Sequence, residues 1–146
     1  MNTIDPRDLL RALATEPDPV LAAIDGHRRA AVVFEAVIDE VRELEDSIPP
    51  ERRTSIAMEP NCDADLEINP NDDPRWQDHC KRYQAAVTEL DNAAYGLCKV
   101  RLSSMAGFVA LYEYVTGREE WELPDDFHIT FVASLPDMLE GLVRAA

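Results

Sequence analysis

The sequence predicts an all-α fold, in which a long antiparallel helical hairpin is followed by one or two C-terminal helices. Three observations support this prediction. Apolar residues recur at steps of three and four over two long segments, which is the spacing of one helix face. Asp-Pro steps open both segments, and an aspartate followed by proline is a typical helix start. The 146 residues include only five glycines, which suits long helices, and the length corresponds to a single domain.

The first long helix is predicted from Asp18 to about Ser47, after a short helix over residues 6–14 that begins at Asp5-Pro6. Its apolar face comprises Val20, Ile24, Ala31, Phe34, Ile38, Val41 and Ile48, and His27 falls in the same register. Acidic and basic residues occupy the opposite face. Because a single amphipathic helix cannot bury its apolar stripe alone, this helix needs a long partner helix.

The second long helix is predicted over residues 73–101 and supplies that partner. Its stripe comprises Trp76, Cys80, Tyr83, Val87, Leu90, Ala94 and Leu97. The register changes near Cys98, since Arg101 takes the next position of the stripe. Residues 51–74 form an acidic, proline-rich insertion between the two helices. The alternations Ile56/Met58 and Leu66/Ile68 are compatible with a small hairpin in this insertion, and an irregular loop is the alternative.

The C-terminal part predicts two further helices. Ser103 or Ser104 caps the first of them, and Gly117 ends it. The predicted apolar face of this helix comprises Met105, Phe108, Val109, Tyr112 and Val115. Asp125-Asp126 caps the last helix, whose apolar face comprises Phe127, Phe131, Leu135, Met138 and Leu142. Pro136 predicts either a kink in that helix or a new start at Ser134.

The charge and the cysteines limit the classes of partner and compartment. The net charge is −15, from 29 acidic and 14 basic residues, so the chain repels phosphate groups and anionic lipids. We therefore expect no binding to nucleic acid or membranes, whereas a basic protein partner is electrostatically compatible. Three widely spaced cysteines without a CxxC motif, and the absence of a signal-peptide pattern, predict a cytoplasmic protein with reduced thiols.

The acidic residues raise the question of a carboxylate-bound metal. All-α nucleotide pyrophosphohydrolases hold Mg²⁺ with ExxE on one helix and ExxD on the next. Glu40 and Glu43 have the first spacing and share one helix face, but the segment beginning at Glu89 ends in the amide of Asn92. Glu40, Glu43 and Glu89 are the candidate metal ligands, and a solvated acidic helix face is the favoured interpretation. No catalytic motif, and hence no cofactor, is predicted.

Two stretches of the chain, DPVLAAIDGHRRAAVVFEAV and SSMAGFVALYEYV, resemble segments of a loosely defined group of small bacterial helical proteins. In that group a first helix with a DP-x-x-x-x-I-x-x-H-R pattern precedes a second long helix. The resemblance covers about a third of the chain and implies an all-α fold with no established activity. The acidic insertion has no counterpart in the group, and no functional residue is carried over.

These patterns favour protein–protein interaction as the function, including self-association into a homodimer or a larger helical bundle. The predicted packing surfaces are two stripes, His27, Phe34, Ile38 and Val41 on the first long helix and Trp76, Tyr83 and Leu90 on the second. One alternative is a metal-dependent enzyme of the pyrophosphohydrolase type, centred on Glu40, Glu43 and Glu89. Another is an acidic inhibitor or decoy of a basic protein.

Overall fold

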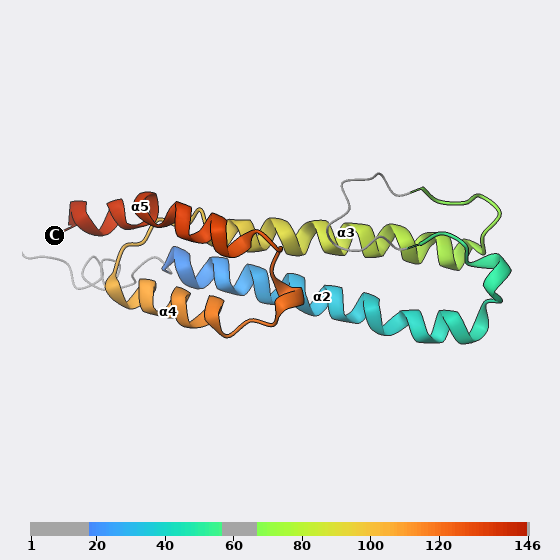
Figure 1. The fold of residues 1–146 in the computed structure, drawn as a ribbon. Helices are drawn as coiled ribbons and strands as arrows, with labels where there is room; N and C mark the ends of the chain where they lie inside the picture. The colour runs from blue at the N-terminus through green and yellow to red at the C-terminus, as the bar shows by residue number, and fades with distance from the viewer. Residues whose placement is uncertain (1–17, 57–66, 146) are drawn as a thin grey trace, which may run out of the picture.

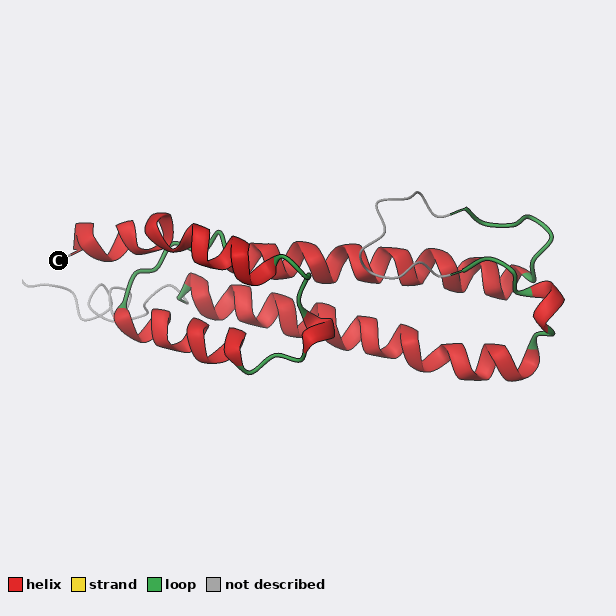
Figure 2. Cartoon of the chain, viewed as in Figure 1, coloured by secondary structure: helices red, strands yellow, loops and turns green. Residues whose placement is uncertain are grey.

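The computed structural model describes residues 18–56 and 67–145, and within these ranges it contains four α-helices and no strand (Figures 1 and 2). The helices are α2 (Pro19–Ser47), α3 (Pro74–Leu97), α4 (Met105–Thr116) and α5 (Phe127–Ala145). Two short 3-10 helices, η1 (Pro50–Arg52) and η2 (Glu120–Glu122), lie in the connections. The all-α prediction is confirmed. None of the helices described is long and apolar enough to cross a membrane.

Some of the sequence predictions lie outside the described residues. The short helix over residues 6–14 is one of them. The small hairpin of the acidic insertion depends on Met58 and Leu66, which also lie outside. Among the cysteines, Cys80 and Cys98 are free and buried, while Cys62 is not among the residues described.

The helices α2 and α3 begin where their Asp-Pro steps predict. The carboxylate of Asp18 accepts a hydrogen bond from the Val20 N–H at 3.0 Å, and Asp73 accepts one from the Arg75 N–H at 2.9 Å. Each cap satisfies an N–H group that a helix start leaves unpaired. The two helices run antiparallel and side by side (Figure 1). Their shared core comprises Ala31, Phe34, Val37, Ala86, Val87 and Leu90.

The helices α4 and α5 cover only one end of the α2–α3 pair. Figure 1 shows α4 beside the first part of α2 and α5 beside the end of α3, beyond which α5 continues along the segment before α4. Buried side chains from all four helices meet at this end, including Val20, Leu97, Leu111, Phe127 and Met138. A glycine favours the close approach of α4 to α2, because a Cβ at Gly107 would lie 2.9 Å from the carboxylate of Asp18 and displace it.

The predicted apolar face of α4 is wrong for three of its residues. Met105, Val109 and Tyr112 are exposed, whereas Gly107, Leu111 and Tyr114 are buried together with Val115. Two contacts turn the helix this way. Gly107 lies against the start of α2, and the Tyr114 hydroxyl is 2.8 Å from a ring nitrogen of His27. A specific polar contact and a close backbone approach therefore outweigh the apolar pattern of this short helix.

The last helix continues through its proline. Ser134 does not start a new helix, since its hydroxyl donates to the carbonyl of Thr130 one turn earlier at 2.7 Å. Pro136 lies inside α5 with its ring exposed to solvent. The segment between α3 and α4 contacts α5, since the Leu102 N–H donates to the carbonyl of Met138 at 3.2 Å. A Cβ at Gly141 would overlap the carbonyl oxygen of Leu102, so this position admits only glycine without rearrangement.

A carboxylate closes the far end of the α2–α3 pair. Asp72 is buried and accepts hydrogen bonds from the backbone N–H and the hydroxyl of both Thr54 and Ser55. Burial alone would raise the pKa of Asp72, but the bonds from Ser55 and Thr54 outweigh it and hold the pKa well below its ordinary value. The indole N–H of Trp76 also donates to the Ser55 carbonyl, at 2.8 Å. The connection is thereby tied to the first turn of α3.

Candidate functional site

The seven residues of the predicted packing surfaces divide into two groups. His27, Phe34, Trp76 and Leu90 are buried within the chain itself, so they stabilise the monomer. Ile38, Val41 and Tyr83 are wholly or partly exposed, because neither α4 nor α5 extends over this part of the α2–α3 pair. Only the second group is accessible to another molecule.

His27 joins three elements through a buried hydrogen-bond network. Its Nε2 is 2.8 Å from the carbonyl oxygen of Glu122, and since a carbonyl only accepts, Nε2 carries the hydrogen. In the neutral ring Nδ1 then accepts from the Tyr114 hydroxyl, also at 2.8 Å. Arg28 and Arg118 lie over the Tyr114 ring, with their guanidinium carbons 5.1 and 4.4 Å from its centre. Burial lowers the pKa of His27, although the bond to Glu122 acts in the opposite sense. This buried network stabilises the fold and does not form an accessible site.

The candidate metal ligands are not assembled into a site. Glu40 forms an ion pair with Arg82 at 2.6 Å, and its carboxylate is 3.9 Å from Nδ1 of the buried His79. Glu43 is exposed on the outer face of α2, and Glu89 lies two turns beyond Arg82 on α3. Within the described part of the chain, no three His, Cys, Asp or Glu side chains are placed to share a metal ion.

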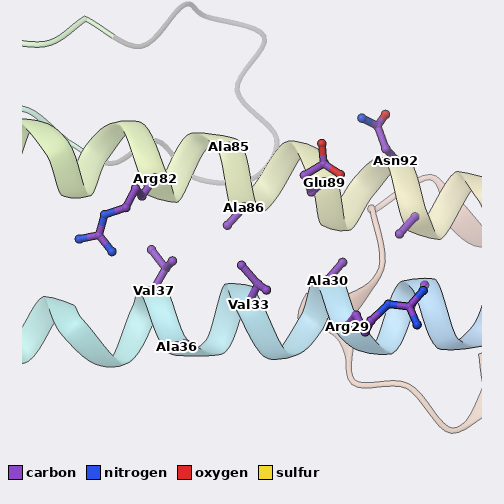
Figure 3. A pocket seen from close by; sticks show the side chains of 12 residues that line it. Arg29, Ala30, Val33, Ala36, Val37, Arg82, Ala85, Ala86, Glu89 and Asn92 are labelled. Atoms are coloured by element: carbon purple, nitrogen blue, oxygen red, sulfur yellow. The ribbon is translucent and has the colours of Figure 1, made fainter.

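A long groove runs between α2 and α3 on the face turned away from α4 and α5 (Figure 3). It encloses about 890 Å³, and no residue of α4 or α5 lines it. Eight of its twelve lining residues are glycine, alanine or valine: Gly26, Ala30, Val33, Ala36, Val37, Ala85, Ala86 and Ala93. Val33 lines this groove and is 55% exposed. An apolar side chain of that exposure among small neighbours leaves room for a helix to approach closely.

The charged residues of the groove are of both signs. Arg29 lines one wall from α2, and Glu89 and Asn92 line the other from α3 at the same level (Figure 3). Arg82 lies at the other end of the groove, where it pairs with Glu40 and Asp78. The groove is therefore locally balanced in charge, although the whole chain carries −15.

The sequence predictions do not include this groove, because its lining residues are mostly small, whereas the predicted packing surfaces consist mostly of large apolar residues. The signal was present as small residues at matching spacings, since the lining positions on α3 repeat the intervals of those on α2. Alanines on a helix surface are also common without any partner, so the spacing alone could not identify an interface.

Comparisons of the chain with protein-family models, curated proteins and solved structures give no match. The resemblance to small bacterial helical proteins stays a prediction. What the molecule does has to be inferred from its own surfaces.

Proposed function

We propose that this chain is a self-associating helical protein, and that the groove between α2 and α3 packs against the same groove of a second copy. The observation that carries the proposal is the exposure of Val33 in a groove of small residues. Two such helix pairs placed face to face form a four-helix bundle, in which small residues allow close contact between helices.

Charge complementarity supports a second copy as the occupant. In a dimer whose two-fold axis runs parallel to the helices, α2 of one copy lies over α3 of the other, without a shift along the axis. Arg29 of each copy then lies over Glu89 of its partner, because the two residues are level across the groove. The same arrangement places Val33 over the alanines Ala85 and Ala86 of the second copy. The Arg29–Glu89 ion pair therefore occurs twice in the dimer.

Two neighbouring valines provide a matched test. Val33 lies in the groove and is 55% exposed, while Val32 is 64% exposed on the outer side of α2. Because both are exposed in the monomer, glutamate at either position leaves the monomer folded. Light scattering over a concentration series should show a dimer for the unmodified chain and for Val32→Glu, and a monomer for Val33→Glu.

Val33→Glu should weaken dimer association strongly, because it places two new carboxylates in one dimer interface. A charge buried without a partner costs several kcal/mol, which corresponds to at least about a hundredfold weaker association. A monomer at all concentrations for the unmodified chain, or a dimer that Val33→Glu leaves unchanged, contradicts the proposal.

A further inference from the structure

We infer that the opposite face of the α2–α3 pair carries a second interaction surface, which binds a basic amphipathic helix of another protein. This surface, the Trp121 shelf, comprises Ile38, Val41, Tyr83 and Trp121. It lies on the face that α4 and α5 cover elsewhere, where the connection between them crosses α2 and contributes Trp121 from η2 (Figure 1). It is separate from the groove of the proposed dimer and does not depend on it.

The shelf is an apolar surface that none of the described helices covers. Trp121 stacks on Phe34 with ring centres 5.8 Å apart and is 42% exposed, and Tyr83 packs on the same phenylalanine at 5.6 Å. Ile38, one turn further along α2, is also 42% exposed. A hollow of about 670 Å³ adjoins these side chains, lined in part by Val41. A helix laid here would continue the layer that α4 and α5 form over the other end of the pair.

The charges around the shelf select the partner. Asp39, Arg42 and Glu45 line the hollow, and Glu45 is paired with Arg53. Glu35, Asp39 and Asp46 are exposed acids on this stretch of α2. Glu119 and Glu120 add exposed acids next to Trp121. A second copy would bring the same acidic surface and be repelled, whereas lysines or arginines flanking an apolar helix face would be attracted.

The side chains of the shelf determine which spacing of apolar residues the partner helix needs. Anchors spaced three, four and seven residues apart on that helix would contact Ile38, Tyr83 and Trp121. Exposed tryptophan and tyrosine side chains at such a surface commonly supply a large share of the binding energy. The basic partner that the net charge favours would thus bind at a defined location on the molecule.

The experiment uses a synthetic, fluorescein-labelled helical peptide with leucine on one face and lysine on the other. Fluorescence anisotropy measures its binding to the full chain. The matched peptide has glutamate in place of every lysine. We expect binding of the lysine peptide, at least about tenfold weaker binding of the glutamate peptide, and weakening of the interaction by salt.

Two glutamate variants separate the shelf from general attraction to an acidic protein. Ile38→Glu and Val32→Glu add the same charge to α2, on the shelf and on the outer side respectively. General attraction predicts equal or tighter binding for both. The shelf predicts at least about a tenfold loss for Ile38→Glu and no loss for Val32→Glu.

Two further variants complete the test. Trp121→Ala should also weaken binding about tenfold or more, because it removes the exposed aromatic anchor. Val33→Glu should bind the peptide as the unmodified chain does, even where it abolishes self-association. No binding of the lysine peptide, or binding that Ile38→Glu and Trp121→Ala leave unchanged, overturns the inference without bearing on the dimer.

Discussion

Removing one oxygen atom tests whether the His27 network locks the fold. In Tyr114→Phe the ring keeps its contacts with Arg28 and Arg118, but Nδ1 of His27 loses the hydroxyl that donates to it. The ring of His27 is fully buried, so no solvent replaces that donor. A buried acceptor left without a partner costs about 1–3 kcal/mol. We expect the free energy of unfolding to fall by that amount, with little change in the denaturant slope.

A double-mutant cycle identifies the cause of that loss. Urea unfolding is measured at one protein concentration for the unmodified chain, Tyr114→Phe, His27→Ala and the double variant. If the hydrogen bond is responsible, Tyr114→Phe costs about 1–3 kcal/mol in the presence of His27 and nearly nothing in its absence. An equal cost in both backgrounds would refute the reasoning. It would mean that the hydroxyl acts on the stability through some other contact.

The remaining predictions concern pH and one glycine. Burial lowers the pKa of both His27 and His79 below the 6.5 of an ordinary histidine, so the unfolded chain takes up protons first as the pH falls. The urea midpoint should therefore be steady above about pH 7 and decline below about pH 6.5, and a midpoint that rises on acidification would contradict this. Both ring nitrogens of His79 lack a hydrogen bond, so His79→Leu should reduce the decline. Gly141→Ala should lower the free energy of unfolding by about 1–3 kcal/mol, because the new methyl group meets the backbone of Leu102. The control Gly96→Ala adds a methyl group in open space and should leave the stability equal or higher. Equal melting temperatures for the two variants would count against the packing of α5 on Leu102.

Local rules predicted the starts and ends of most helices. Asp18, Asp73 and Ser104 cap the helices that they were predicted to cap, and Gly117 follows the last residue of α4. These signals act over three or four residues and need no knowledge of the rest of the fold. The end of α3 was predicted at residue 101, and the helix ends at Leu97, close to the predicted change of register at Cys98.

The features that the sequence could not predict depend on contacts between segments that are distant in the chain. Which face α4 buries depends on Tyr114 meeting His27, which lies 87 residues earlier in the chain. The same holds for the surfaces. Ile38 belongs to a helical stripe that is buried at His27 and exposed at Ile38, because the covering helices are shorter than α2. Periodicity identifies the stripe of a helix but not the length of its neighbours.

The most direct test of the proposed dimer is an exchange of charges between Arg29 and Glu89, measured by sedimentation velocity. Both side chains are exposed at the groove, so the substitutions leave the monomer intact. Arg29→Glu alone and Glu89→Arg alone each place like charges opposite one another twice in the interface, and each variant should sediment as a monomer. Mixing the two variants restores both ion pairs, so the mixture should form a heterodimer. Variants that still dimerise separately, or a mixture that remains monomeric, would contradict the two-fold packing of the groove.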